Sequence, residues 1–211
     1  MTDRRASDAL QSLKDGNQRF VAGTLARITD HDDAVRQELS AGQSPIAVVV
    51  SCSDSRVAPT VVFDQRLGDL FTVRVAGNVT PPEVVGSIEF AVSQLGTRLV
   101  VVIGHTGCGA IAATLDEVER PSHALTPALR SLIDRIRPAV DHARGDSPAG
   151  SVLQGSERLR VLDDAMRENV HVAVRRLGSE SALLARMVEE DGLMIVGAGY
   201  SLETGVVDFL E

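Results

Sequence analysis

Two kinds of hydrophobic pattern alternate along the chain. Short runs rich in valine, leucine and isoleucine are too short for helices and are typical of buried strands. Between these runs, apolar residues recur every third or fourth position, which is the spacing of an amphipathic helix. The short runs predict strands at 46–50 (IAVVV), at 70–75 (LFTVRV), from residue 99 onward (LVVVIG) and at 193–200 (LMIVGAGY). The helical spacing predicts helices at 7–22, 31–41, 83–96, 109–120, 157–177 and 181–190, and a looser helical region within 122–150.

Strands that alternate with helices indicate an α/β fold with a parallel sheet. We therefore predict a central, mostly parallel sheet of four strands, flanked by helices. Residues 205–210 are expected to return as an antiparallel edge strand. A chain of 211 residues can bury a substantial core, so residues 1–211 are expected to form a single domain.

The two helices ahead of the first strand form an N-terminal helical extension, residues 1–42. The first of them carries an apolar stripe of Leu10, Leu13 and Phe20, and no element that would cover this stripe is evident in the sequence. We therefore expect the extension to pack on a second copy of the chain, and the protein to be at least a dimer.

Composition and charge narrow the class of partners. The net charge of −8 argues against nucleic acid and against an anionic membrane surface. No uninterrupted apolar run approaches the roughly 20 residues that a membrane helix needs. The first residues also lack the apolar core of a secretory signal. These features predict a cytoplasmic protein whose two cysteines are reduced.

Functional side chains gather directly after two of the predicted strands. Cys52, Asp54 and Arg56 follow the first strand, and His105 and Cys108 follow the third. The carboxyl ends of parallel strands meet at one edge of a sheet, and ligand sites lie outside those ends, so we expect these side chains to converge. Thiolates and imidazoles are ligands that zinc prefers. The pattern therefore predicts a zinc (Zn2+) site.

Asp54 leaves two alternatives open. Three protein ligands would leave the fourth zinc position to water, as in catalytic zinc sites. Asp54 could occupy that position itself, or it could pair with the guanidinium of Arg56 and accept a hydrogen bond from hydroxide on the zinc. After the second strand, residues 76–78 (AGN) form a small-residue loop where the backbone could approach a ligand.

These motifs resemble those of the β-class carbonic anhydrases. The resemblance rests on CSDSRV at 52–57 and HTGCG at 105–109, and it extends through RVAGN at 74–78 and GSIEFAV at 86–92 to the terminal strand near Tyr200. It therefore covers most of the chain.

The resemblance implies zinc bound by Cys52, His105 and Cys108, and reversible hydration of carbon dioxide to bicarbonate. It also implies a dyad of Asp54 and Arg56 that orients or gates the fourth metal position. For the assembly, it implies a homodimer whose N-terminal helix embraces the partner, often assembled further into a tetramer.

The resemblance also implies a set of substrate-pocket residues. One group of the family lines the pocket with Gln, Phe and Tyr, and these positions fall on Gln43, Phe71 and Phe90, the last of which lacks the tyrosine hydroxyl. Gly109 is expected to line the same pocket. Another group binds non-catalytic bicarbonate with a Trp three residues before the first cysteine. That position is Val49 here, and the chain has no Trp.

Plainer interpretations compete with these. The two cysteines could be small buried apolar residues at strand ends. Gly197 and Gly199 form half of a dinucleotide-binding fingerprint, but the third glycine is out of register. The other histidines stand in polar helical contexts and are expected to be solvated rather than to shuttle protons. They are His31, His123, His142 and His171.

Two other functions remain open at this level. The same site could act on carbon disulfide or carbonyl sulfide, in which case the shape of the access channel would decide. A non-enzymatic alternative is a zinc-stabilised module in which Asp54 closes the site permanently. The presence of Arg56 argues against this module, because a permanently closed site has no need of a competing partner for the carboxylate.

Overall fold

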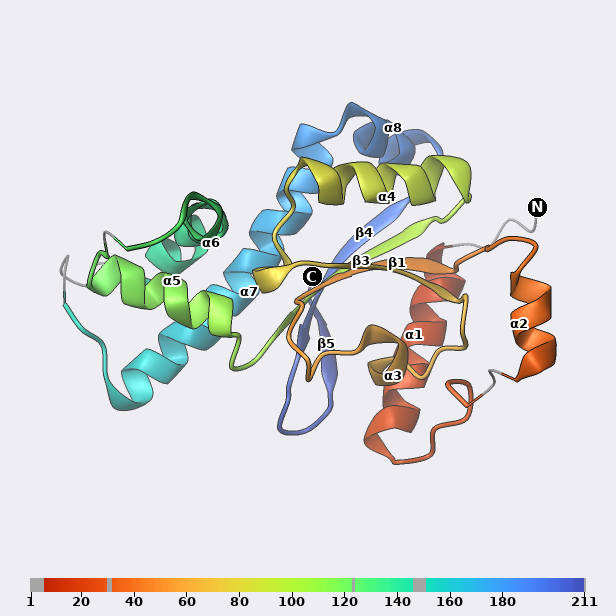
Figure 1. Cartoon of the computed structure of the whole chain (residues 1–211), viewed down its shortest axis with the longest axis horizontal. Coiled ribbons are helices and arrows are strands. Elements are labelled where there is room, and N and C mark those ends of the chain that lie inside the picture. Colours follow the sequence, from red (N-terminus) through yellow and green to blue (C-terminus); the bar gives the residue numbers. More distant parts are fainter. Residues whose placement is uncertain (1–5, 30–31, 123, 146–150, 211) are drawn as a thin grey trace.

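A five-stranded sheet forms the centre of the computed structural model, which describes residues 6–29, 32–122, 124–145 and 151–210 (Figure 1). Across the sheet, the strands lie in the order β2 (Leu70–Arg74), β1 (Ala47–Ser51), β3 (Leu99–His105), β4 (Met194–Tyr200) and β5 (Val207–Leu210). The first four are parallel to one another, and β5 is antiparallel to β4. The predicted fold class is therefore confirmed.

Helices cover both faces of the sheet and extend beyond one end of it (Figure 1). The helices on one face are α4 (Pro82–Gln94), α7 (Gly155–Glu180) and α8 (Ala182–Glu190). Those on the other face are α1 (Ala6–Val21) and α3 (Pro59–Val62). Beyond the carboxyl ends of the strands lie α5 (Gly109–Glu119) and α6 (Pro127–Arg144), packed on α7. Because both faces are covered, every residue of β1 and β3 is buried.

The helix ends agree with the predicted ones to within a few residues. The looser helical region within 122–150 contains α6, whose start is capped by Thr126: its side chain accepts a hydrogen bond from the backbone N–H of Leu129. In the described residues, no helix is both long enough and apolar enough to cross a membrane.

The N-terminal helix α1 packs on the sheet of its own chain, which corrects one expectation. Its buried residues Ala6, Ala9 and Leu13 belong to one apolar cluster with Val49 of β1 and Val101 of β3. The interpretation that the apolar stripe of α1 has no cover within its own chain is therefore wrong. The reason is that hydrophobic patterning does not show which sheet face the later helices leave bare, and α4, α7 and α8 all lie on the other one.

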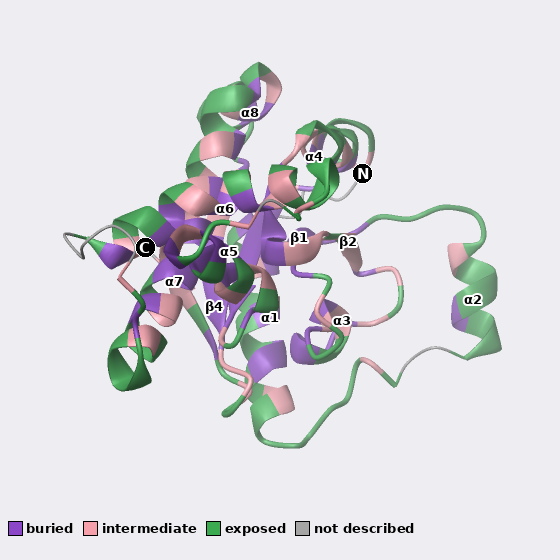
Figure 2. Cartoon of the chain, turned by 60° about the vertical axis from the view of Figure 1, so that its left-hand side comes forward, coloured by how far each residue is buried: buried purple, intermediate pink, exposed green. Residues whose placement is uncertain are grey.

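The second helix of the extension, α2 (Asp33–Leu39), projects from the body of the chain (Figure 2) and contacts it near Gly68, beside which the Leu39 side chain lies. Of its residues, only Val35 is buried. The predicted start of this helix at His31 lies outside the described residues. The segment between α1 and α2 is anchored by the buried carboxylate of Asp64, which accepts hydrogen bonds from the backbone N–H groups of residues 26–28. Packing of residues 1–42 on a second copy stays a prediction.

Gly197 lies inside β4 and serves packing rather than nucleotide binding. A Cβ at this position would lie 2.8 Å from Cγ1 of Val170 on α7. The missing side chain therefore lets α7 approach the sheet closely.

Candidate metal centre

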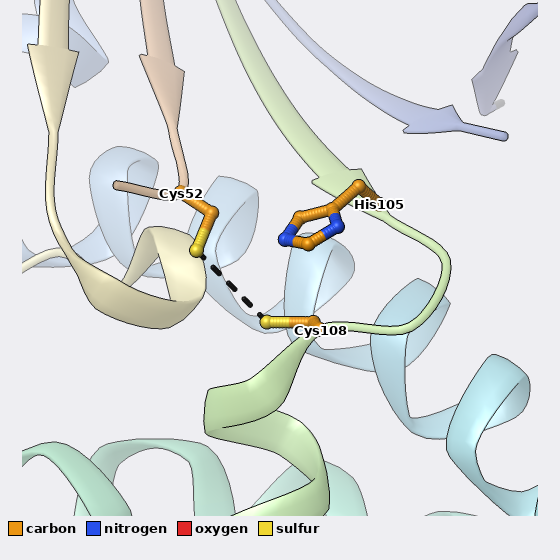
Figure 3. A group of neighbouring side chains, drawn as sticks. All are labelled: Cys52, His105 and Cys108. Atoms are coloured by element: carbon orange, nitrogen blue, oxygen red, sulfur yellow. Dashed lines mark hydrogen bonds between the residues drawn. The ribbon is translucent and has the colours of Figure 1, made fainter. Parts of the chain in front are cut away.

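Three potential metal ligands converge beyond the carboxyl ends of β1 and β3 (Figure 3). Cys52 directly follows β1, and His105 is the last residue of β3. The two strands are parallel neighbours with Ser51 beside Ile103, so both residues reach the same edge of the sheet. Cys108 follows at the N-cap of α5. The ligand atoms of the three residues lie within 4.8 Å of one another, so the convergence expected from the sequence is present.

The loop between β3 and α5 presents Cys108 to the other two ligands. The hydroxyl of Thr106 accepts a hydrogen bond from the backbone N–H of Leu202 at 3.0 Å, which ties this loop to the end of β4. At the other end of the loop, the backbone N–H groups of Ala110 and Ile111 in the first turn of α5 act to lower the pKa of the Cys108 thiol. Such amides at a helix N-terminus favour a thiolate.

The two sulfurs lie 4.0 Å apart, within hydrogen-bonding distance of each other. The hydrogen bond from the Cys108 thiol lowers the pKa of Cys52 to about 4, against the opposing effect of burial and with help from His105 and Gly77. The same contact, together with burial, raises the pKa of Cys108, because its ionisation would place a second thiolate beside the first. A divalent cation between the sulfurs removes this conflict, since it compensates both negative charges.

His105 has one ring nitrogen satisfied and the other without a partner. Its Nδ1 lies 3.0 Å from the carbonyl oxygen of Thr106, which assigns the proton to Nδ1. Its Nε2 is buried and has no hydrogen-bond partner, although the ring faces the two sulfurs (Figure 3). A zinc-binding histidine commonly donates one N–H to a carbonyl and directs the other nitrogen at the metal. The orphaned Nε2 therefore fits a zinc ion.

The donor set as a whole agrees with the same ion. Two thiolates and one imidazole are typical ligands of zinc and leave a tetrahedron one ligand short. Among the residues that the structure describes, this is the one cluster of three or more His, Cys, Asp or Glu residues able to hold a metal ion.

Asp54 lies beside the cluster and is held by Arg56. The Nε and Nη2 groups of Arg56 donate to the two carboxylate oxygens at 2.9 and 2.8 Å, and the backbone N–H of Arg56 donates to Oδ1 at 3.0 Å. These bonds hold the pKa of the Asp54 carboxyl well below its usual range. Its Oδ2 lies 3.9 Å from Nε2 of His105. Of the two alternatives for Asp54, the structure contains the pairing with Arg56.

Arg74, at the end of β2, is a residue that the hydrophobic pattern does not single out. Its Nε donates to the carbonyl oxygen of Cys52 at 3.2 Å, and its Nη2 donates to that of Asp54 at 2.8 Å. Arg74 thereby fixes the backbone that carries both residues. Its place at the head of the RVAGN motif is the signal that could have drawn attention to it.

The small-residue loop after β2 approaches the side chain of Cys52, and its approach to a bound ligand stays a prediction. Within this 3-10 turn, η1 (Ala76–Asn78), the backbone N–H of Gly77 donates to Sγ of Cys52 at 3.3 Å. The carbonyl oxygen of Gly77 accepts a hydrogen bond from Nδ2 of Asn169 on α7 at 2.8 Å. The sequence contains a signal for Asn169, because this polar residue lies three positions after Met166 and four before Ala173, at the spacing of the apolar face of α7.

The expected pocket residues fall into two groups. Gly109 is the first residue of α5 and adjoins the ligand loop. Gln43, by contrast, precedes β1 and lies at the end of that strand opposite the ligands. Phe71 pairs with Val48 early in β1, and its ring lies 6.4 Å from that of the half-exposed Phe90. Within one chain, the structure does not bring Gln43, Phe71 and Phe90 to the metal ligands, and their role in a pocket stays a prediction.

The remaining histidines stand on helices or outside the described residues. His142 lies on α6 and is exposed, and His171 lies on α7 and is partly buried. His31 and His123 lie outside the described residues.

Comparison with known proteins finds relatives over most of the chain. The family model described as carbonic anhydrase matches residues 47–207. Carbonic anhydrase 2 of Mycobacterium tuberculosis is 38% identical over 199 residues, covering 93% of this chain and 89% of that protein. A carbonic anhydrase of Mycolicibacterium smegmatis is 38% identical, with coverage of 95% and 91%. Among solved structures, the β-carbonic anhydrase CafA of Aspergillus fumigatus matches with a TM-score of 0.70 at 28% identity, covering 84% of this chain and 81% of that one.

Proposed function

The chain belongs to the β-class carbonic anhydrase family, and from this premise we propose that it catalyses the reversible hydration of carbon dioxide to bicarbonate and a proton. The cofactor in this proposal is zinc, bound by Cys52, His105 and Cys108. The observation that carries the proposal is the buried convergence of two sulfurs with an imidazole nitrogen that has no other partner.

Each ligand contributes a defined atom to the metal site. Cys52 and Cys108 supply their sulfurs as thiolates, and His105 supplies Nε2 as a neutral imidazole. Zinc in a site with three protein ligands acidifies water to a pKa near 7, which makes a nucleophile for carbon dioxide available at neutral pH.

Asp54 orients the attacking water in this proposal. Because Arg56 keeps the carboxylate ionised, Asp54 can only accept hydrogen bonds there. Its Oδ2, which lies beside the ligands, accepts a hydrogen bond from the O–H group of the water. The remaining lone pair of the water oxygen is then turned toward carbon dioxide, which places the reacting atoms in line before the reaction.

The dyad of Asp54 and Arg56 also serves as a pH-dependent gate in this proposal. Asp54 could close the site by taking the fourth metal position, and Arg56 competes for the same carboxylate. As the pH falls, hydroxide becomes scarcer as a competitor for that position, so closure by Asp54 is favoured. Asp54 itself stays ionised throughout, because its pKa is far lower. Activity is therefore expected to rise between about pH 7 and pH 8 more steeply than one ionisation allows.

The primary experiment is a stopped-flow assay of carbon dioxide hydration above about pH 8, with zinc content measured on the same sample. Acceleration of hydration by zinc-loaded protein is the expected result. Zinc-loaded protein without this activity would contradict the proposal. Turnover of carbon disulfide or carbonyl sulfide in parallel assays, with none of carbon dioxide, would assign the alternative substrates.

Crystal structures on both sides of the pH transition test the gate. Asp54 is expected on the zinc below the transition and on Arg56 above it. If Asp54 stays on Arg56 at about pH 6 and water remains on the zinc, the gate does not exist. If Asp54 stays on the zinc at every pH in an inactive protein, the non-enzymatic zinc module is the better description.

The proposed assembly is a homodimer or a tetramer in which residues 1–42 pack on the partner. The exposure of α2 and of the Phe90 ring supports this assembly. Light scattering after size exclusion measures the mass directly, and a monomer would contradict it. Deletion of residues 1–22 is a poor test, because α1 covers the sheet of its own chain and its loss would unfold the domain.

A cytoplasmic location completes the proposal. The sulfurs of Cys52 and Cys108 lie 4.0 Å apart and are free thiols, so an oxidising compartment would favour a disulfide at the expense of two ligands. Thiol titration of protein freshly isolated from its cells is expected to find both cysteines reduced.

A further inference from the structure

A residue far from the ligand motifs reaches the metal site through one glycine. Asn169 lies on α7 and is 2% exposed. Its Nδ2 donates a hydrogen bond to the carbonyl oxygen of Gly77 at 2.8 Å. The backbone N–H of the same glycine donates to Sγ of Cys52 at 3.3 Å, in the turn that lies beside Cys52 (Figure 3). Two consecutive buried hydrogen bonds therefore connect α7 with a metal ligand.

The turn accepts only glycine at this point. Gly77 has a φ of +69°, in the left-handed region that side chains disfavour. A Cβ there would lie 2.6 Å from Cδ1 of Ile136 on α6 and 3.2 Å from Cβ of Ala110 on α5. Two helices close over the glycine, so few orientations are open to its peptide groups. The hydrogen bond from Asn169 selects among them.

Asn169 stands out on its own helix face. The buried residues on either side of it along α7 include Met166, Val170 and Ala173, which are apolar. Burying an amide without a partner costs free energy, whereas an apolar side chain would fill the same space without that cost. Packing alone therefore does not account for an amide at this position, and its donor is directed at Gly77.

We propose that Asn169 is a positioning residue of the metal site, which acts by aiming the Gly77 N–H at the Cys52 sulfur. An N–H donor draws charge away from a thiolate and fixes its direction. With this bond in place, the Cys52 sulfur neutralises less of the charge of the metal that it binds, so the metal remains a stronger Lewis acid. This inference rests on the proposed zinc site.

Cobalt substitution reports the contact without an activity assay. Thiolate ligands of Co2+ give a sulfur-to-cobalt charge-transfer band, whose energy follows the charge on the sulfur. Asn169→Ala is expected to shift this band to longer wavelength, because a sulfur that loses its hydrogen bond gives up an electron more readily. Zinc affinity, measured by competition with a chelator, is expected to fall about 10-fold, because the Cys52 sulfur is no longer held in the direction of the metal and this loss of orientation outweighs the stronger charge donation.

Val161→Ala is the matched control. Val161 is also on α7, is fully buried, and belongs to the same apolar cluster as Cys52, but its side chain makes no hydrogen bond. This variant is expected to lose thermal stability and to keep both the wild-type band and the wild-type zinc affinity. If Asn169→Ala does not fold, Asn169→Ser replaces it, because the shorter hydroxyl keeps a polar group yet does not reach Gly77.

The outcomes separate this inference from the proposed function. If the wild-type protein shows no thiolate-to-cobalt band, the metal site itself is refuted. If the wild type shows the band and the Asn169 variant leaves its position and the zinc affinity unchanged, the positioning role is refuted and the proposed function stands. Equal shifts in the Asn169 and Val161 variants would also refute the role, because lost packing would then explain both.

Discussion

Two arginine–carboxylate pairs of opposite character lie near the two ends of helix α5. At the N-terminal end, beside the metal ligands, Asp54 pairs with Arg56, whose side chain is 57% exposed. At the C-terminal end, the carboxylate of Glu119 is 2% exposed and accepts hydrogen bonds from Arg144 and Arg158, each at 3.3 Å. The same two chemical groups therefore meet in two very different environments, one near each end of this helix.

The buried cluster has a single arrangement. Glu119 also accepts a hydrogen bond from the backbone N–H of Leu153 at 2.9 Å, so its carboxylate joins the end of α5 to α6, to the segment before α7, and to α7 itself. Removing one member of such a cluster leaves a buried charge without compensation, which costs several kcal/mol.

In the proposed gate, the pair of Asp54 and Arg56 exchanges partners instead. Arg56 reaches solvent, so water can replace the carboxylate on its guanidinium at little cost. Asp54 then has two partners within reach, the guanidinium and the metal position. Burial thus decides whether an arginine–carboxylate pair fixes a fold or leaves a functional group free to change partners.

The largest effect is expected from removing a metal ligand near the N-terminal end of α5. Cys108→Ser should lose zinc and carbon dioxide hydration together, because a serine hydroxyl does not replace a thiolate ligand. Cys52→Ser should do the same. Zinc per chain and stopped-flow rates measure both losses, and the chelator-treated variants should unfold at the same temperature as chelator-treated wild type. Full zinc occupancy after removal of either thiol would contradict the catalytic zinc site.

The second prediction concerns the buried cluster at the C-terminal end of α5. Glu119→Gln removes the charge of the buried carboxylate that faces Arg144 and Arg158, and it should lower the free energy of unfolding by about 3–5 kcal/mol. Zinc affinity should stay within a few-fold of wild type. Urea unfolding measures the first quantity and chelator competition the second. As a control, Asp164→Asn removes an exposed pair with Arg160 and should cost less than about 1 kcal/mol.

The metal centre could be predicted from the sequence, because the local hydrophobic pattern and one rule of sheet topology are enough to place its ligands. Valine-rich runs mark β1 and β3 as buried parallel strands, and Cys52 and His105 follow from their positions at the strand ends. No knowledge of side-chain packing is needed. The small residues of η1 likewise indicate, without knowledge of packing, that backbone lies close to the site.

The rest depends on packing that no local pattern contains. Glu119 and Arg144 stand among ordinary charged helix residues, and only the contact of three distant segments buries them. The cover that α1 gives its own sheet depends in the same way on where the later helices lie. Gln43 and Phe71 show the limit for pockets, because resemblance assigns them a role that the geometry of one chain does not provide.

A smaller effect is expected when Arg56 is replaced. Arg56→Ala should lower kcat/KM about 10- to 100-fold, because Asp54 loses the partner that holds it off the metal and the closed form is favoured at every pH. Thermal stability should change little, since the Arg56 side chain is exposed. Arg56→Lys should not restore activity, because an ammonium does not provide the two-pronged contact. Restoration by Arg56→Lys would mean that charge alone matters.

The smallest expected effect concerns acid stability. In the folded protein, hydrogen bonds from Arg56 hold the pKa of Asp54 well below its usual range, whereas the unfolded chain has an ordinary value near 4. The pair therefore contributes stability above about pH 4 and loses this contribution as the pH falls through the lowered value. In Arg56→Ala, the pKa of Asp54 should return toward the ordinary value, so the free energy of unfolding should fall less steeply below about pH 4. A carboxyl NMR titration of the chelator-treated protein measures the shift at Asp54 directly. An unchanged Asp54 midpoint in the variant would mean that Arg56 does not hold the carboxylate in solution. Asp54 and Arg56 would then not interact in solution, and Arg56 could not compete with the metal for the carboxylate. The two ends of α5 would then differ because the buried cluster of Glu119 interacts and the pair at the metal site does not.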